Sequence, residues 1–452
     1  MLEFKESIPF DYCGYFAVVV PFLEKYSWIF RYNNTKFIRF GVLEQLPREW
    51  IDDLDTLSNE EFNQIPLGLY KDSWSSSFRE FLSTVRSLQV GYEEYAVPEK
   101  ETRICSKVKK HYEVASLGSY IVSLQNVSKE PPKVYVDFGC GVGLLAGFVH
   151  NLLDVKVLGI DGNPALIERC NESTRGKNDL QFVHHFITIN SFEFIKRELM
   201  DRFGESDTFV QATVMGLHAC ADLSVTAIKC FLQSSWCRSI TIMPCCYHLM
   251  KTIQEETPAN DGIEFQNFPL SAELRRMVDD ENRAMICKSF LRLACQQTSS
   301  RWKNLTTEQH LQHGRTMFRR SLIDAILEVD ELVHVGKRKQ LPEETTVDNM
   351  LQQFTLRKAS DQQELPWTEQ HRGKLSALLG RYGTVGPRLA EYVECLQMCL
   401  QKICENVVLL DRMCYLEKES KRYELNISRK LVRLQNDGLT PRCFIFHASK
   451  DE

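Results

Sequence analysis

One stretch of the chain combines residue types that could hold a ligand, Val-Tyr-Val-Asp-Phe-Gly-Cys-Gly-Val-Gly at residues 134–143. An apolar, β-branched run leads into alternating glycines and then into an apolar run of helical length, which predicts a buried strand, a tight turn and a helix start. Gly139, Gly141 and Gly143 carry no Cβ, so the backbone can bend sharply and lie against a bound molecule. Asp137 adds a carboxylate at the strand end, which favours a cationic group over a phosphate.

Two classes of ligand fit this glycine turn. A dinucleotide site also needs spaced glycines and an acidic residue about 20 positions later, and residues 141–146 satisfy that pattern in a shifted register. Asp137 separates the interpretations, because its carboxylate would repel a pyrophosphate but could pair with the ammonium group of S-adenosyl-L-methionine. Asp161 suits a ribose in either case. A tight turn that binds nothing is the remaining alternative.

Further cofactor contacts are expected after the next two strands. Gly162 and Asn163 allow close approach to the ribose or the adenine before Pro164 opens a helix. His184 and His185 lie at the end of the third predicted strand, where an adenine contact is expected, and strand phase decides which of them faces it. We take His185 as the candidate.

A second group of polar side chains is expected where the acceptor would lie. Cys220 lies in a segment that follows the fourth predicted strand, and residues 245–248, Cys-Cys-Tyr-His, follow the fifth. These strands are expected to be neighbours, so both groups should open into one cleft beside the transferable methyl group. The candidate catalytic residues are His218, Asp222, Tyr247 and His248.

Each catalytic candidate also has a purely structural interpretation. A histidine titrates at about pH 6.5 in water, which suits His218 and His248 to removing a proton from the acceptor, but either could simply line a strand end. Asp222 precedes an apolar helical run and could be its N-cap, which is worth about 1 kcal/mol. Tyr247 could stack on a base or plug the cleft. A cysteine nucleophile would need surroundings that favour the thiolate.

The same histidines and cysteines could bind zinc. Cys245 and Cys246 argue against this, since consecutive side chains on a strand point to opposite faces. We therefore assign no metal ligands from the sequence.

An alternation of strands and helices positions these residues. It predicts a doubly wound, Rossmann-like α/β sheet. The expected strands are 134–138, 155–160, 179–187, 208–217 and 238–243, and the first helix is 144–153. Segments 423–431 and 442–450 have the composition of a closing antiparallel strand pair around a turn.

Roughly 175 residues separate the fifth strand from this pair, far more than a normal connection, so an inserted helical domain is expected there. A long helix is predicted at 389–418. The predicted domains are a helical N-terminal subdomain (1–105), a first core part with the cofactor site (106–248), a helical insertion that could cover a substrate (249–385) and a last core part (386–452).

Composition limits the class of protein. The chain has 452 residues, 43% hydrophobic and 25% charged, with a net charge of −5, which is ordinary for a globular protein and gives no global basic signature for nucleic acid. The apolar segment 15–23 is too short to cross a bilayer, which takes about 20 residues. Sixteen scattered cysteines and the absence of a secretory pattern indicate a reducing compartment, cytoplasmic or nuclear, with no membrane association and no DNA partner expected.

The motifs resemble those of class I S-adenosylmethionine-dependent methyltransferases, through VDFGCGVG at 136–143 and GIDGNP at 159–164. More specifically, the chain is similar to the methyltransferase-like protein 25 family. The segments that carry this similarity are LPREW (46–50), KKHYEV (109–114), GLHACADLS (216–224), CCYHLM (245–250), FPLS (268–271), LRLACQ (291–296), LLDRMCYLEKE (409–419) and LTPRCFIFHASK (439–450).

The resemblance implies methyl transfer from S-adenosyl-L-methionine. A more distant likeness to a tRNA 2′-O-methyltransferase family favours RNA as the acceptor. Ala221 stands where those relatives usually carry a glycine. A protein or small-molecule acceptor, and a scaffold that binds the cofactor without catalysis, are the alternatives.

Basic residues interleaved with aromatics in the predicted insertion could grip a phosphate backbone and stack bases. A solvated helix face would explain the same residues. They are Arg292, Arg301, Trp302, Lys303, Arg315, Phe318, Arg319, Arg320 and the run 336–339, with a second basic spot at 107–111. No Asn-Pro-Pro-Tyr segment ends the fourth strand, so methylation of adenine N6 is not supported.

Overall fold

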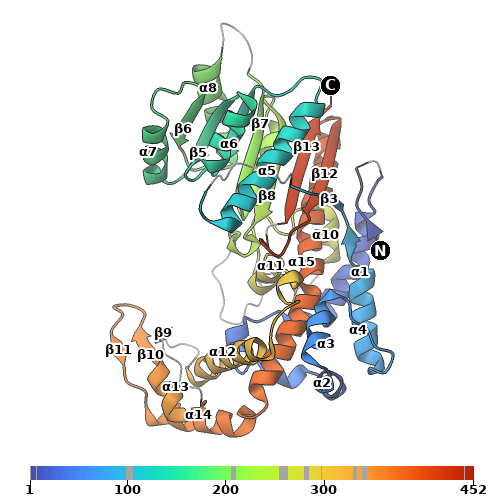
Figure 1. Cartoon of the computed structure of the whole chain (residues 1–452), viewed down its shortest axis with the longest axis vertical. Coiled ribbons are helices and arrows are strands. Elements are labelled where there is room, and N and C mark those ends of the chain that lie inside the picture. The colour runs from blue at the N-terminus through green and yellow to red at the C-terminus, as the bar shows by residue number, and fades with distance from the viewer. Residues whose placement is uncertain are drawn as a thin grey trace.

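The computed structural model describes residues 2–6, 8–97, 105–204, 210–253, 263–278, 285–296, 298–328, 333–337, 344–441 and 443–451. The chain has the outline of a C, with an α/β lobe at the top and a helical lobe that runs down one side and along the bottom (Figure 1). Among the described residues, no helix is both long enough and apolar enough to cross a bilayer.

Within the described residues the main sheet has eight strands in the order β3-β12-β13-β8-β7-β4-β5-β6. Strands β4 to β8 pair in parallel, and β13 runs antiparallel to β8 and β12. The strands are β3 (Glu93–Tyr95), β4 (Val134–Phe138), β5 (Lys156–Asp161), β6 (Leu180–His184), β7 (Ala212–Cys220), β8 (Cys237–Cys245), β12 (Ile427–Leu434) and β13 (Phe444–Lys450). Since β5 and β6 lie on one side of β4 and β7 and β8 on the other, the topological switch point is the carboxyl end of β4. The predicted fold class is confirmed.

Helices cover both faces of this sheet. They are α5 (Val108–Val127), α6 (Leu144–Leu153), α7 (Pro164–Ser173), α8 (Phe192–Phe203) and α9 (Asp222–Gln233). Successive side chains of β4 alternate between the faces. Tyr135 belongs to the core cluster that contains Leu117 of α5 and Leu145 of α6, whereas Val136 belongs to the cluster that contains Ile195 of α8.

The helical lobe is built around α15 (Gly386–Arg422), a helix of 37 residues that is buried over most of its surface. This helix packs against helices from both the N-terminal region and the insertion, and its buried residues include charged ones such as Glu394, Asp411 and Arg412. The other elements are α1 (Tyr12–Lys25), α2 (Arg48–Asp55), α3 (Asn59–Gln64), α4 (Ser76–Ser87), α10 (Ala272–Met277), α11 (Lys288–Leu293), α12 (Thr307–Ile326), α13 (Val347–Gln353) and α14 (Glu369–Tyr382), with strands β1 (Leu2–Glu3), β2 (Val90–Gly91), β9 (Val333–Lys337), β10 (Phe354–Lys358) and β11 (Glu364–Leu365).

The predicted ends of two strands were wrong, and the correct ends place candidate site residues inside the strands. The fourth predicted strand stopped at Leu217, but β7 continues to Cys220, and β8 continues to Cys245 instead of Met243. An irregularity after Gly216 shifts the register, and the two strands then pair again up to Cys220 and Cys245. His218 and Cys220 therefore lie in a strand and not after it. Positions 208–209 are outside the described residues.

Other bounds moved without consequence for the site. Helix α6 has the predicted bounds, and the predicted helix 389–418 is confirmed as part of α15. The first closing strand was predicted from Tyr423, which instead ends α15, and β12 begins at Ile427. Position 442 is outside the described residues. The predicted domain boundaries remain predictions.

Candidate cofactor and acceptor site

The glycine turn after β4 has the backbone geometry that its sequence predicts. Gly139, Gly141 and Gly143 have φ angles of 72°, 57° and 72°, a region that side chains with a Cβ rarely adopt. A Cβ built on Gly143 would lie 2.7 Å from the ring of Phe182, so this glycine is also needed for close packing of α6 on β6. A Cβ on Gly141 would meet nothing within 4 Å, which leaves the backbone there open to a ligand.

Asp137 is almost completely buried, at 1% exposure, in the strand that leads into this turn. The backbone of Ala146, in the first turn of α6, donates a hydrogen bond to its carboxylate. Its Oδ2 atom has no hydrogen-bond partner among the described residues. Burial raises the pKa of Asp137 to about 7, against the opposing effect of the Lys110 charge. A buried carboxylate oxygen without a donor is what a bound ammonium group would satisfy.

Asp161 holds the glycine turn in shape. Its Oδ2 accepts a hydrogen bond from the backbone N–H of Gly141 at 2.9 Å, and its Oδ1 accepts one from the backbone N–H of Asn163 at 2.8 Å. Each carboxylate oxygen keeps further acceptor capacity, so a ribose hydroxyl could still donate to it. Asn163 accepts from the backbone N–H groups of Ala165 and Leu166, so its side chain is the N-cap of α7.

The two histidines at the end of β6 make different contacts. His185, the predicted adenine contact, places Nε2 2.8 Å from Ser191 Oγ and stacks its ring on Phe194, and its role toward the adenine stays a prediction. His184 instead places Nε2 3.2 Å from the carbonyl oxygen of Gly162. Phe186, which is 66% exposed, lies over Gly162, where a Cβ would be 2.9 Å from the ring. Sequence reasoning missed Phe186, although it directly follows the two histidines.

His218 projects from β7 toward α5. Its Nε2 is 3.4 Å from Oε2 of Glu113, which is 2% exposed, and Oε1 of Glu113 accepts a hydrogen bond from the Thr440 hydroxyl at 2.7 Å. The Nδ1 atom of His218 is buried and has no hydrogen-bond partner among the described residues. Glu113 was not singled out from the sequence. The presence of a charged residue between the apolar positions of α5 is the signal that could have found it.

The N-cap interpretation of Asp222 was wrong. The cap position of α9 is Ala221, whose φ of 50° and ψ of −121° suit a glycine, and α9 has no side-chain cap. Asp222 is the first helical residue, and its carboxylate accepts hydrogen bonds from the backbone N–H of Lys251 at 2.9 Å and from Nδ2 of Asn267 at 2.8 Å. It therefore fastens the first part of the insertion to the end of β7.

Tyr247 and His248 lie in different surroundings. Tyr247 is 1% exposed, and the guanidinium of Arg412 lies over its ring at 4.7 Å, so it plugs the interior instead of presenting a stacking face. His248 is partly exposed, and its Nδ1 is 3.3 Å from Cys295 Sγ. Burial, followed by the charge of Arg292, lowers the pKa of His248, which keeps it neutral at physiological pH.

Cys245 and Cys246 are not consecutive strand residues, contrary to the prediction, because β8 ends at Cys245. Cys246 has left φ 52° and ψ 42°, outside the strand conformation, so the alternation of strand side chains does not apply to it. The sulfur atoms of Cys220, Cys245 and Cys246 all lie within 4.8 Å of one another.

The elements that carry this geometry match a known family. Residues 109–253 match a family model described as a methyltransferase domain. These residues form a methyltransferase domain. The matched segment runs from α5 through β8, so the methyltransferase domain includes both the glycine turn and the cysteine-containing strand ends.

Two curated proteins are similar to about half of this chain. A human protein named "Probable methyltransferase-like protein 25" is 26% identical over 250 residues, and its Mus musculus counterpart is 24% identical over 253 residues. Each match covers 53% of this chain and 37% of the relative, so the matched part is little more than a third of those proteins. The resemblance to the methyltransferase-like protein 25 family is confirmed.

Solved structures with some similarity are methyltransferases as well. Coclaurine N-methyltransferase bound to N-methylheliamine and SAH is 12% identical, with coverage of 93% of this chain and 100% of that chain and a TM-score of 0.25. The plantazolicin methyltransferase BpumL in complex with SAH is 12% identical, with coverage of 90% and 98% and a TM-score of 0.24.

Proposed function

We propose that the methyltransferase domain binds S-adenosyl-L-methionine and transfers its methyl group. The observation that carries this proposal is the buried carboxylate of Asp137, which has one oxygen without a donor and lies beside a turn whose backbone is open at Gly141. Asp137 would hold the ammonium group, the turn would lie against the carboxylate end, and Asp161 would receive the ribose hydroxyls. When bound, the cofactor supplies an electrophilic methyl group on a positively charged sulfur.

The chain's own contribution to transfer would be positioning and removal of a proton. His218 is the best-placed candidate for accepting the proton, because Glu113 Oε2 lies 3.4 Å from its Nε2 and would orient the ring. Glu113 is itself held by Thr440, so it acts as a positioning residue for His218. Tyr247, which is fully buried, would support the site from behind.

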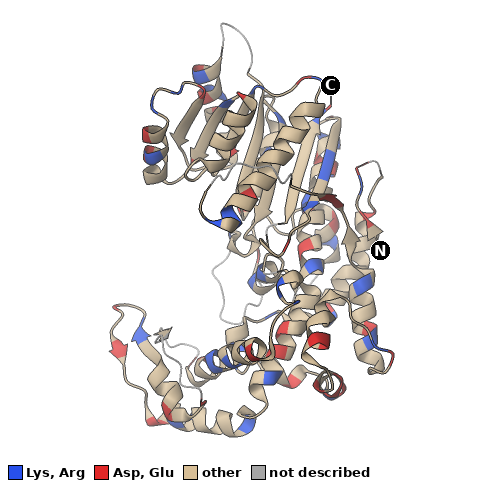
Figure 2. Cartoon of the chain, in the orientation of Figure 1, with Lys and Arg blue, Asp and Glu red and all other residues tan. Residues whose placement is uncertain are grey.

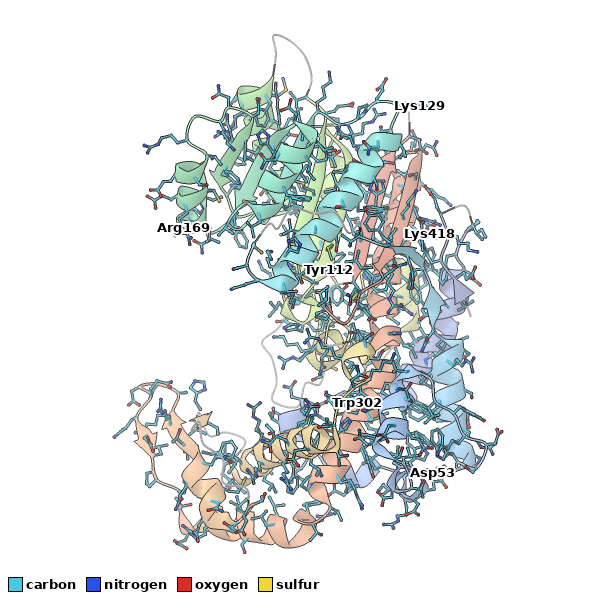
Figure 3. The ribbon with its side chains drawn as sticks, in the orientation of Figure 1. Asp53, Tyr112, Lys129, Arg169, Trp302 and Lys418 are labelled. Atoms are coloured by element: carbon cyan, nitrogen blue, oxygen red, sulfur yellow. The ribbon has the colours of Figure 1, made fainter. Side chains whose placement is uncertain are left out.

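We propose RNA as the acceptor. Basic side chains of the insertion support this, since Arg301, Lys303 and Arg320 are exposed and Lys and Arg mark α12 in Figure 2. The expected stacking of bases on Trp302 and Phe318 is wrong, because both rings are buried, at 4% and 0% exposure, and Figure 3 shows Trp302 among packed helices. Arg319 is also buried, and residues 338–339 of the predicted basic run lie outside the described residues. Contacts to the phosphate backbone therefore carry the RNA proposal.

We also propose a cytoplasmic or nuclear location. The chain has sixteen cysteines, all in its described part, and none of them forms a disulfide bond, which fits a reducing compartment.

Methyl transfer can be tested with radiolabelled S-adenosyl-L-methionine and separate pools of RNA, protein and small molecules. We expect label in RNA with the unaltered chain, and at least about a 100-fold loss with Asp137→Asn, because removing one partner of a buried pair costs about 3–5 kcal/mol. Label confined to protein or to small molecules would end the RNA proposal. Cofactor binding without transfer to any pool would identify a scaffold.

A further inference from the structure

Three cysteine thiols meet at the carboxyl ends of β7 and β8, on the side of the domain where the acceptor would lie. Cys220 and Cys245 are opposite each other in the register of the two strands, and their Sγ atoms are 3.1 Å apart. Cys246 adds a third sulfur within 4.8 Å of both. Among the described residues, no other group of three or more His, Cys, Asp or Glu side chains has ligand atoms gathered in this way.

The backbone of Cys246 is held in a conformation that brings its sulfur to this group. Its φ of 52° lies in the left-handed region, which residues other than glycine enter at a cost of about 1–3 kcal/mol. Such conformations persist where the surrounding structure imposes them, and they cluster at functional sites. Without this turn, the side chains of Cys245 and Cys246 would point to opposite faces of the sheet.

The spacing of the sulfurs agrees with a tetrahedral metal. With Zn–S bonds of about 2.3 Å, two thiolates on one zinc ion lie about 3.8 Å apart. The observed separations, from 3.1 Å to at most 4.8 Å, bracket that value. Cys245 is 2% exposed while Cys220 and Cys246 are partly exposed, so the group has both a buried anchor and a route to solvent.

A buried positive charge near the three cysteines also favours a negatively charged group there. Arg412 of α15 is 1% exposed, and its Nη1 and Nη2 atoms have no hydrogen-bond partner among the described residues. The neighbouring carboxylate of Asp411 accepts hydrogen bonds from Leu270 and Ser271. Arg412 is close enough to Cys245 for a negative charge there to act on the guanidinium. One Zn²⁺ with three thiolates carries a net charge of −1, which would balance it.

We propose that Cys220, Cys245 and Cys246 bind one zinc ion, with the fourth position open to a ligand from outside the chain. Binding releases the three thiol protons to solvent and forms three Zn–S bonds. Soft thiolate ligands select zinc over magnesium or calcium, and three protein ligands with an open position are typical of zinc sites that take a further ligand. Cys295 is left out, because its thiol contacts the carbonyl oxygen of Leu291 at 3.3 Å and the ring of His248.

Zinc binding can be tested on the full chain after metal removal under reducing conditions. We expect uptake of about one Zn²⁺ per chain, and Co²⁺ in its place should give the strong visible absorption of a tetrahedral thiolate site. Cys220→Ala and Cys246→Ala should each weaken Zn²⁺ binding more than about 100-fold, since even residues that only support metal ligands are worth 10–100-fold. Circular dichroism would show whether each variant is folded.

Two control variants each remove a cysteine that is not a proposed zinc ligand. Cys295→Ala removes a neighbouring thiol and Cys230→Ala removes a buried thiol of α9, and both should bind Zn²⁺ like the unaltered chain. No Zn²⁺ uptake by the reduced, folded chain, or a Cys220–Cys245 disulfide found by mass spectrometry in its place, would overturn the proposal. Loss of Zn²⁺ in Cys295→Ala would overturn the set of three ligands. Titration of S-adenosyl-L-methionine into the same variants tests the proposed function separately.

Discussion

Asp137 is the residue on which the cofactor proposal depends. Its burial opposes ionisation, and the free energy needed to ionise it is recovered only when a cation binds beside it. Because its pKa is raised above the ordinary value, the protonated form is favoured in the folded chain without ligand. The folded chain without ligand therefore becomes less stable as pH rises. Its free energy of unfolding falls between the ordinary carboxyl range and about pH 7.

The same pKa predicts how cofactor affinity depends on pH. An ammonium group binds the ionised form of Asp137, so the affinity for S-adenosyl-L-methionine should fall about tenfold for each pH unit below about 7 and level off above it. Isothermal titration across this range measures the effect. An affinity that is independent of pH through this range would contradict a direct contact between Asp137 and the ammonium group.

Gly143 and Gly147 allow a direct comparison of alanine substitutions. Gly143 has a left-handed backbone and a crowded Cβ position, whereas Gly147 is helical with open space around it. Gly143→Ala places a Cβ 2.7 Å from Phe182 at a φ of 72°, so we expect the free energy of unfolding to fall by about 1–3 kcal/mol. Gly147→Ala, in the interior of α6 with nothing within 4 Å of the new Cβ, should raise it by about 0.5–1 kcal/mol. Urea unfolding compares the two. Equal effects would show that the turn does not need its left-handed geometry.

At the residue scale, the sequence predicted those parts of the site that depend on local chemistry. The glycine turn, Asp137 and Asp161 have the geometry that their types and spacing imply. The contacts that were missed join residues far apart in the chain, such as Glu113 with His218 and Arg412 with Tyr247. Such pairs follow from tertiary packing, which one sequence does not specify.

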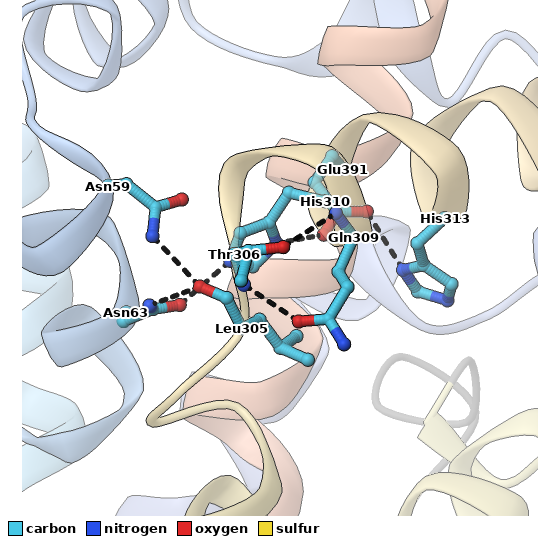
Figure 4. Close-up of polar contacts among 8 residues, drawn as sticks. All are labelled: Asn59, Asn63, Leu305, Thr306, Gln309, His310, His313 and Glu391. Atoms are coloured by element: carbon cyan, nitrogen blue, oxygen red, sulfur yellow. Dashed lines mark hydrogen bonds and ion pairs between the residues drawn. The ribbon is translucent and has the colours of Figure 1, made fainter.

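At the scale of elements, α12 and α15 are joined by a polar cluster that also reaches α3. His310 and His313 of α12 both contact the carboxylate of Glu391, at 2.5 Å and 2.8 Å, and Nε2 of His310 is 2.7 Å from Asn63 (Figure 4). Asn63 and Asn59 also donate to the carbonyl oxygen of Leu305. This cluster therefore ties the insertion to the N-terminal helices through α15.

Part of this cluster should respond to pH. The hydrogen bond to Glu391 raises the pKa of His313 above the ordinary histidine value of about 6.5. The contact therefore stabilises the fold fully below about pH 6.5, and this stabilisation is lost as pH rises through the raised pKa. His313 is 43% exposed, so we expect His313→Ala to cost only about 0.2–1 kcal/mol more at about pH 5.5 than at about pH 8.5. Urea unfolding at both values measures this difference.

His334→Ala, which removes an exposed histidine of β9, is measured in parallel as the control. A His313→Ala effect that grows with pH would have the wrong sign for a histidine with a raised pKa.

Element existence was easier to predict than element ends. The five parallel strands, α6 and α15 were found because their apolar runs are long and regular. The ends of β7 and β8 were placed too early, because the strands continue through polar and cysteine residues that pair only after the irregularity at Gly216. That pairing decides whether Cys220 and Cys245 are side by side, and it cannot be predicted from one sequence because it depends on the register between two separate strands.

At the scale of the whole molecule, the basic surface of the insertion is the feature that the RNA proposal uses. We expect Arg301→Glu combined with Arg320→Glu to lower methyl transfer to RNA about tenfold or more, because phosphate contacts dominate such affinity, and to leave cofactor affinity unchanged. Lys129→Glu provides the control, since Lys129 is exposed two residues after the end of α5 in the upper lobe (Figure 3). An equal loss in both variants would point to a general effect of charge and not to an RNA surface.

The measurement that tests the central claim most directly is isothermal titration of S-adenosyl-L-methionine into the full chain and its Asp137→Asn variant at about pH 8, where Asp137 is ionised. We predict one binding site in the unaltered chain and an affinity at least about 100-fold weaker in the variant. The folded variant should be no less stable than the unaltered chain, because it loses a buried charge whose Oδ2 atom has no donor, and an amide oxygen can still accept from the Ala146 backbone. No binding by the unaltered chain, or equal affinity in both proteins, would contradict the account.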